Sequence, residues 1–186
     1  RMHDAGAKLV LGHTIKAGGG QQDGEQVLDI LAKHPSTARF ISTKLARRFV
    51  SDTPPQTLVD RAAKRFRETD GDIREVVRTI ITSPEFFSAE AYRAKVKTPF
   101  EFVVSAVRAT GTDTPSGLPF VAALRELGMP LYMCQPPTGY ADRADAWVNT
   151  GALLARMNFA VSLTSPKRPR GNPAIPTDPE VAVNTL

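Results

Sequence analysis

The stretch that decides the fold is residues 35–87, which read PSTARFISTKLARRFVSDTPPQTLVDRAAKRFRETDGDIREVVRTIITSPEFF. Its apolar residues recur at helical spacing: Leu58, Ala62 and Phe66 lie four apart, and positions 73, 76, 77, 80 and 81 form an i, i+3, i+4, i+7, i+8 stripe. Two prolines and an Asp-Gly-Asp turn separate the periodic runs. The stretch therefore predicts three amphipathic helices, followed by Phe86 and Phe87, which we expect to close one end of a core.

Length and composition are typical of a soluble globular protein. The chain has 186 residues, of which 41% are hydrophobic, enough for one domain with a well-buried core. No apolar run approaches the roughly 18 residues of a membrane span. Cys134 is the only cysteine, which excludes an intrachain disulfide and leaves a cysteine-based zinc site short of ligands. The formal net charge of +5 favours acidic partners only if the positive charges cluster.

Three regions follow from the order of these patterns. Residues 1–20 are expected to form a β-ribbon, with Gly12 at the first position of a two-residue type II′ turn, and a glycine-rich joint. Residues 21–164 are expected to form one helical domain. Residues 165–186 hold many prolines, which favours an extended tail. The predicted fold class is all-α: an irregular orthogonal bundle of six to eight helices with a minor N-terminal β-hairpin and an extended Pro-rich C-terminal tail.

Four further helices are predicted, three of them from capping residues. Asp23 is predicted to cap a helix over 24–33, and Thr98 with Glu101 forms a capping box for a helix that runs to about 110. A helix is expected over 117–127, and Asn149 is predicted to cap the last helix, which ends at 163. The positions that we expect to be buried in the first helix are Val27, Leu28, Ile30 and Leu31, and the apolar side of the last is Leu153, Leu154, Met157 and Val161.

Several motifs carry a family resemblance. They are RFISTKLARRFV at 39–50, TDGDIR at 69–74, SPEFF at 83–87, KTPFEF at 97–102, and PPTGY at 136–140 followed by a tryptophan. Over roughly residues 3–163 the chain resembles the C-terminal part of the bacterial Domain-of-Unknown-Function 1800 (DUF1800) family. The resemblance implies no established activity, substrate or cofactor. It implies longer relatives with a large N-terminal helical portion, and a periplasmic or secreted location.

The resemblance also shapes the expected partner. The chain begins at Arg1 and not at a methionine, so we expect a C-terminal helical module of a larger protein. Its first expected partner is then the missing N-terminal segment of the same protein, and its role is structural or protein-interacting. The alternative is an enzyme whose active site lies between this piece and the N-terminal portion. Convergence of His3, Asp4, Lys8, Tyr140 and Asp142 in one cleft would favour the enzyme.

No catalytic residue is predicted, and the cofactor is left open. The sequence contains no phosphate-binding loop and no nucleophile elbow, and a calcium loop at the Asp-Gly-Asp turn would lack its first and last ligands. The nearest candidates for a metal site are His3, Asp4 and His13. Their spacing matches no recurring metal motif, which favours a structural role at the polar ends of the hairpin.

Two groups of residues are candidates for binding. In the first group, positive charges gather on two neighbouring helices. We favour the interpretation that these faces are ordinary solvated surfaces. The alternatives are docking of an acidic protein surface and, least expected, binding of nucleic acid. Tyr140, Asp142 and Trp147 lie in an irregular loop, where sites often occur, although anchoring of the loop is the favoured role. The cations of the two faces are Lys44, Arg47 and Arg48 on one helix and Arg61, Lys64 and Arg65 on the next.

Overall fold

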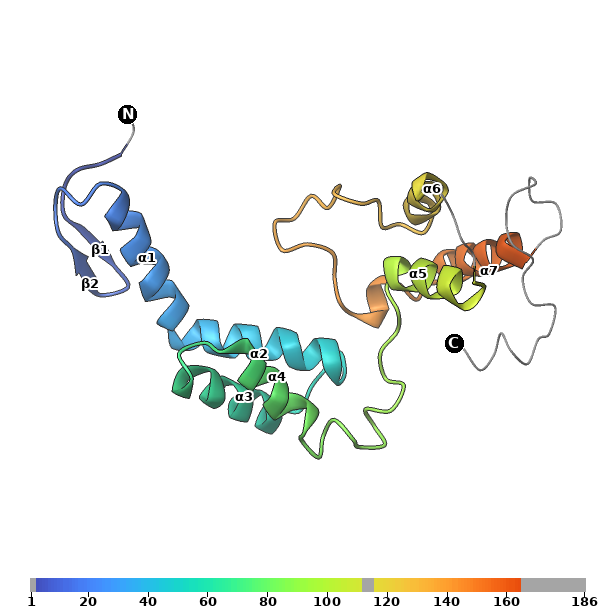
Figure 1. The fold of residues 1–186 in the computed structure, drawn as a ribbon, viewed down its shortest axis with the longest axis horizontal. Coiled ribbons are helices and arrows are strands. Elements are labelled where there is room, and N and C mark those ends of the chain that lie inside the picture. Colours follow the sequence, from blue (N-terminus) through green and yellow to red (C-terminus); the bar gives the residue numbers. More distant parts are fainter. Residues whose placement is uncertain (1–2, 112–115, 165–186) are drawn as a thin grey trace. The chain divides into compact units, whose positions relative to one another are not determined.

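The computed structural model describes residues 3–111 and 116–164 (Figure 1). In these residues the chain forms seven α-helices, one short 3₁₀ helix and a two-stranded antiparallel hairpin, which confirms the predicted all-α class with a small N-terminal β-hairpin. Two compact units are present, one comprising residues 1–94 and the other beginning at Lys95. The proposed tail at 165–186 lies outside the described residues, and the boundaries at 20 and 164 stay predictions.

The N-terminal hairpin pairs β1 (Lys8–Val10) with β2 (His13–Ile15). Its two turn residues are Leu11 and Gly12, with φ of 48° and 81°. Two consecutive positive φ angles are typical of a type I′ turn, whose twist matches that of the flanking strands. The predicted type II′ turn, with Gly12 in the first position, is therefore wrong by one residue.

Helix α1 (Gln21–Lys33) begins three residues earlier than predicted, after Gly20. Asp23 lies inside its first turn and does not cap it. The expected burial of the apolar stripe is only partly correct, because Val27 and Ile30 are half-buried whereas Leu28 and Leu31 are exposed. The main packing partners of α1 are β2 and α2, and they leave Leu28 and Leu31 uncovered.

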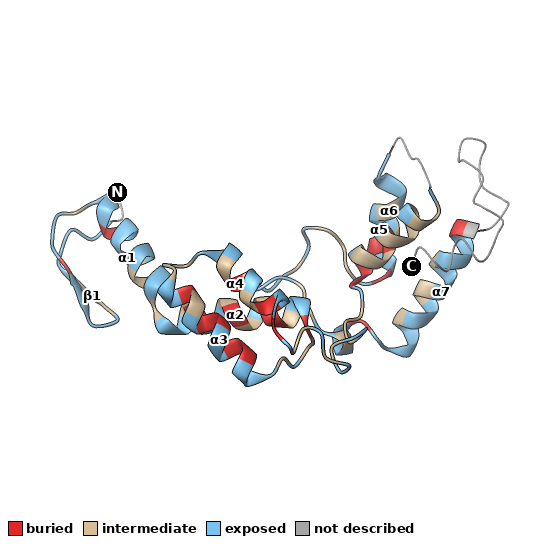
Figure 2. Ribbon diagram, turned by 60° about the horizontal axis from the view of Figure 1, so that its bottom comes forward, coloured by how far each residue is buried: buried red, intermediate tan, exposed pale blue. Residues whose placement is uncertain are grey.

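The core of the first unit lies between α2 (Pro35–Phe49), α3 (Gln56–Glu68) and α4 (Ile73–Ile81), as the opening stretch predicts (Figures 1 and 2). Asp72 caps α4 by accepting hydrogen bonds from the backbone N–H groups of Arg74 and Glu75. Phe86 packs against the core, but Phe87 is exposed, so the expected aromatic closure holds for one ring only. The buried residues of this core are Ala38, Ala46, Val50, Leu58, Val59, Ala62, Ala63, Phe66, Val76 and Ile80.

The second unit contains α5 (Pro99–Ala109), α6 (Leu118–Glu126), the 3₁₀ helix η1 (Ala144–Ala146) and α7 (Thr150–Thr164). The predicted capping box of Thr98 and Glu101 is present at the start of α5. Asn149 Oδ1 accepts a hydrogen bond from the Ala152 backbone N–H at 2.9 Å, as expected of an N-cap. The core of this unit is smaller than that of the first: it contains Val103, Leu124 and Leu127, with Phe102, Val107, Phe120, Leu131, Ala155 and Phe159 packed around them.

Candidate interaction surfaces

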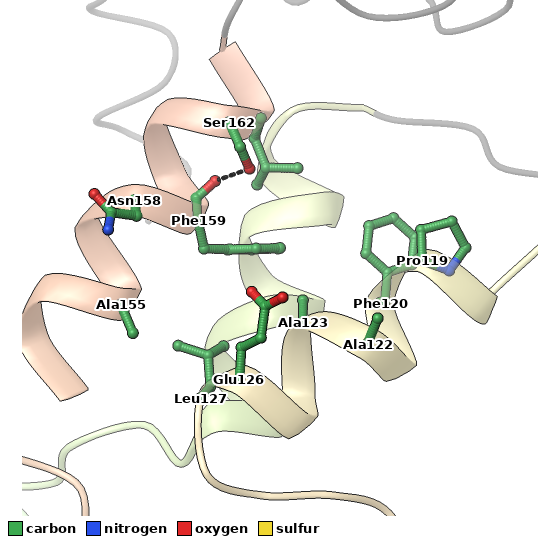
Figure 3. A pocket seen from close by; sticks show the side chains of 11 residues that line it. Pro119, Phe120, Ala122, Ala123, Glu126, Leu127, Ala155, Asn158, Phe159 and Ser162 are labelled. Carbon is green, nitrogen blue, oxygen red and sulfur yellow. Dashed lines mark hydrogen bonds between the residues drawn. The ribbon is translucent and has the colours of Figure 1, made fainter. Parts of the chain in front are cut away.

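Helix α7 packs on its own unit through one side only. Phe102 of α5 and Phe159 of α7 meet edge to face, with ring centroids 5.9 Å apart. Ala155 and Phe159 also line a cavity of about 480 Å³ beside α6, with Ala123 and Leu127 across it (Figure 3). Within that view Ser162 donates a hydrogen bond to the carbonyl of Phe159 at 2.7 Å. The packed side of α7 thus consists of small and aromatic residues that fit against α5 and α6.

The other side of α7 is apolar and exposed. Four of its residues have between 47% and 66% of their surface exposed to solvent, namely Leu153, Leu154, Met157 and Val161. These are the residues of the predicted apolar side, and we call them the open face of α7. The sequence predicts that these residues form the apolar side of the helix, and in the structure this side does not pack on the core of its own unit. A helix that is apolar on all sides is usually buried on all sides. Among the described residues, however, no element covers the open face of α7.

The open face also carries no charge. The only ionisable side chain of α7 between residues 150 and 164 is Arg156, and it lies on the packed side. Its guanidinium stands 5.2 Å from the centroid of the Phe102 ring and donates to the Lys97 carbonyl at 2.8 Å. Burial lowers the pKa of Arg156. Recognition at the open face would therefore depend on apolar contact and not on charge.

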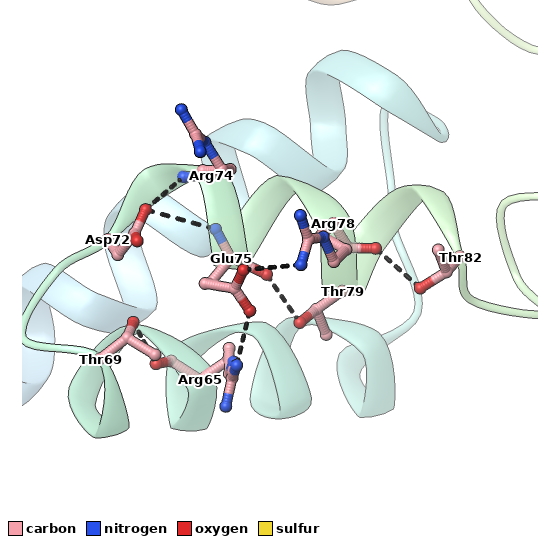
Figure 4. Close-up of polar contacts among 8 residues, drawn as sticks. All are labelled: Arg65, Thr69, Asp72, Arg74, Glu75, Arg78, Thr79 and Thr82. Carbon is pink, nitrogen blue, oxygen red and sulfur yellow. Dashed lines mark hydrogen bonds and ion pairs between the residues drawn. The ribbon is translucent and has the colours of Figure 1, made fainter.

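The cations of the predicted basic face on α3 are paired with carboxylates. Arg61 contacts Glu85 at 2.6 Å, and Lys64 lies 3.7 Å from Glu68. Arg65 contacts Glu75 at 2.5 Å, and Arg78 also reaches that carboxylate (Figure 4). Each arginine lowers the pKa of its partner carboxyl, because the hydrogen-bonded guanidinium favours the ionised form.

The cations of the predicted basic face on α2 also contact groups of their own unit. Lys44 Nζ lies 5.5 Å from the centroid of the Phe40 ring, and Arg47 Nε donates to the Asp52 carbonyl at 3.1 Å. Arg48 has an interaction partner as well. The arrangement on both helices is that of long side chains folded onto their own surface, which supports the solvated-face interpretation of Lys44, Arg47, Arg48, Arg61, Lys64 and Arg65.

A polar cluster joins the hairpin to α1. The Asp23 carboxylate, with 5% of its side chain exposed, accepts a hydrogen bond from Lys8 Nζ at 2.9 Å and lies 3.1 Å from His3 Nε2. The hydrogen bond from Lys8 lowers the pKa of Asp23, and His3 acts in the same direction. Gly19 is required beside it, since a Cβ there would come within 2.0 Å of Asp23 Oδ1. Sequence reasoning missed this role of Asp23, because a first-turn aspartate looks like a cap.

The three candidate metal ligands do different things. His3 contacts Asp23, whereas Asp4 Oδ1 accepts a hydrogen bond from the backbone N–H of Gly6 at 2.8 Å. His13 is exposed on β2, opposite Val10. Across residues 3–111 and 116–164, no three His, Cys, Asp or Glu side chains gather in a way that could hold a metal ion.

The loop candidates hold one another in place. Tyr140 Oη donates to the Pro130 carbonyl at 2.6 Å, and Trp147 Nε1 donates to the Ala141 carbonyl at 2.7 Å. Their ring centroids lie 6.0 Å apart, and burial raises the pKa of Tyr140. Asp142 pairs with Lys95 at 3.2 Å, a partner 47 positions away that no local sequence signal indicates. These contacts support the anchoring role of Tyr140, Asp142 and Trp147.

Comparison with known proteins adds the family. No curated protein and no solved structure matches the chain. In the part that the structure describes, none of the helices is both long enough and apolar enough to span a membrane. The family model described as "Protein of unknown function (DUF1800)" matches residues 1–186, the whole chain. The chain therefore belongs to the DUF1800 family.

Proposed function

We propose that this chain is a helical interaction module that packs the open face of α7 against another polypeptide. The observation that carries the proposal is the exposure of Leu153, Leu154, Met157 and Val161 on a helix whose opposite side is packed. Three of them, at 154, 157 and 161, follow the i, i+3, i+7 spacing of a helix that packs on another helix.

The free energy available at this face is substantial. Complete burial of a Leu, Val or Met side chain contributes about 1.5–3 kcal/mol. Since roughly half of each side chain is already covered, the four residues together would contribute roughly 4 kcal/mol on contact with a partner. Exposed to water, they instead form an apolar patch of the kind that marks protein interaction sites.

The partner that we propose first is another helical segment of the same polypeptide, as the resemblance to longer proteins predicts. An uncharged face is best matched by an apolar helix side, because a charged partner would lose its hydration without gaining an ion pair. A separate protein or a second copy of this chain are the alternative partners.

The test uses two variants of the natural protein, produced in its own cells and purified as an assembly. Met157→Lys should leave the melting temperature of the isolated chain unchanged, because the side chain is exposed, but should lower that of the assembly or dissociate it. Asp145→Lys, at an exposed position of η1, is the matched control and should affect neither. An assembly that tolerates Met157→Lys as well as Asp145→Lys would contradict the proposal.

The enzyme alternative has one observation in its favour, namely that His3 and Lys8 meet on the buried Asp23 carboxylate. Against it, Tyr140 and Asp142 each have a bonding partner of their own, which favours an anchoring role for both. A panel of chromogenic ester, phosphate ester and glycoside substrates tests it. Turnover by the natural protein that is lost in Asp23→Asn would support the enzyme over the module.

A further inference from the structure

A second apolar surface of the same unit lies between α5 and α6. It is a groove of about 310 Å³, and its lining is apolar except for Arg108. Along α5 the groove runs from Phe100 to Arg108, and along α6 it runs from Gly117 to Leu124. The other apolar lining residues are Val103, Val104, Val107, Phe120, Val121 and Leu131.

The groove and the surface that holds α7 share only Phe120 among their lining residues. Helix α6 turns Ala123 and Leu127 toward the α7 side, whereas Val121 and Leu124 line the groove. The groove is open to solvent along its length, because 38–44% of the surface of three lining residues is exposed: Phe100, Val104 and Val121. A small molecule bound there would leave much of its own surface in water, whereas ligand pockets usually enclose most of the ligand. An elongated partner therefore fits better.

The walls of the groove decide the conformation of that partner. Both walls are helices, whose backbone N–H and C=O groups are already paired within each helix. An extended peptide would find no backbone partner on them and would leave its own polar groups unpaired. A helix satisfies its own backbone and presents only side chains. The groove length, from residue 100 to residue 108 of α5, is about 12 Å, which equals just over two helical turns.

Arg108 adds a charge requirement at one end. It is exposed in the last turn of α5, and it has no ion-pair partner among the described residues. A carboxylate placed one turn beyond the apolar anchors of the partner would pair with it. We infer that the α5–α6 groove binds an amphipathic helix of a partner polypeptide, with apolar anchors at i, i+3 or i+4, and i+7, and an acidic residue one turn further on.

This inference rests on the proposed interaction role but concerns a different surface, so the two can fail separately. The probe is a fluorescein-labelled synthetic helix of about 14 residues with leucines at the anchor positions and one glutamate in the following turn. Its binding to the full 186-residue chain is measured by fluorescence anisotropy. Val121→Asp should weaken binding at least about tenfold, since it buries a charge in the groove.

Leu118→Asp is the matched control, because Leu118 is exposed on the same helix and does not line the groove. It should leave the affinity unchanged. Arg108→Glu should weaken binding of the glutamate peptide several-fold and should restore it for a peptide that carries lysine in that place. Circular dichroism melting curves check that each variant remains folded.

Three results would overturn the inference: no saturable binding of the glutamate peptide, equal effects of Val121→Asp and Leu118→Asp, or no rescue by charge reversal. Dodecanoate that binds when the peptide does not would show that the occupant is a small amphiphile and that the assignment to a helix is wrong. If Met157→Lys disrupts the natural assembly while Val121→Asp leaves the affinity for the peptide unchanged, the groove inference fails and the proposed role of α7 stands.

Discussion

Replacement of Ile80 with alanine should destabilise the first unit by about 4 kcal/mol. Ile80 is fully buried on α4, in the core that α2, α3 and α4 share. The change removes three carbon atoms, which costs roughly 2.4 kcal/mol in lost transfer free energy at about 0.8 kcal/mol per methylene. A residual cavity of about 60 Å³ would add roughly 1.5 kcal/mol. The sum lies within the range expected for truncation of a large aliphatic residue in a packed core.

The assay is equilibrium unfolding in urea, followed by circular dichroism at 222 nm, a wavelength that reports helix content. Ile81→Ala is the matched control, since Ile81 is the next residue of α4 but is 39% exposed. It should change the free energy of unfolding by no more than about 1 kcal/mol. Equal midpoints for Ile80→Ala and Ile81→Ala would refute the three-helix core.

Further predictions concern the polar cluster, two glycines and the basic faces. The pKa of Asp23 is lowered in the folded state, so its contribution to stability is present above its unfolded pKa of about 3.9 and is lost as pH falls through the lower folded value. Protection factors of the hairpin amides against hydrogen exchange, which are corrected for the intrinsic pH dependence of exchange, should fall over that window in the natural chain, and Asp23→Asn should remove this pH dependence. Gly19→Ala should lower the melting temperature, because its Cβ would overlap Asp23. Gly24→Ala, with open space around it in α1, should instead raise the free energy of unfolding by about 1 kcal/mol. A higher melting temperature for Gly19→Ala than for Gly24→Ala would contradict the described contacts. Random duplex DNA should show no saturable binding even in dilute buffer, because the cations of α3 are paired with Glu68, Glu75 and Glu85; a submicromolar, salt-sensitive complex in an electrophoretic mobility assay would overturn this interpretation.

Local signals predicted most of the helices. The period of the apolar residues located α2, α3 and α4, and the predicted caps at Thr98 and Asn149 act within three residues of their own position. Such contacts depend only on neighbours in the sequence, so the residue types suffice to find them. The family motifs added the membership that the family model confirms.

Contacts between distant residues were not predictable in the same way. Asp23 has the residue type and position of a helix cap, and its actual partners lie 15 and 20 residues before it. Arg65 belongs to the predicted basic face, but its charge is offset by Glu75, which follows the turn into α4. Pairing of this kind depends on how helices pack, which single-sequence periodicity does not determine.

Periodicity also identifies an apolar face without revealing what covers it. The pattern at Leu153, Leu154, Met157 and Val161 is the same whether the side faces its own core or a partner. Leu28 and Leu31 of α1 illustrate the same ambiguity, since both continue an apolar stripe and both are exposed. The sequence therefore predicts that these positions favour burial, and only the packing shows that their own unit does not bury them.

Cysteine labelling at position 157 tests the interaction role most directly. Met157→Cys in a Cys134→Ser background would be labelled with a maleimide both in the purified chain and in the assembly taken from its own cells, with Asp145→Cys as the reference for exposed thiols. We expect the two thiols to react at similar rates in the purified chain, where both positions are exposed. In the assembly we expect Cys at 157 to react at least about tenfold more slowly than the reference, because a partner excludes solvent from the open face of α7. Equal rates in the assembly would show that the face stays in water and would contradict the proposed function.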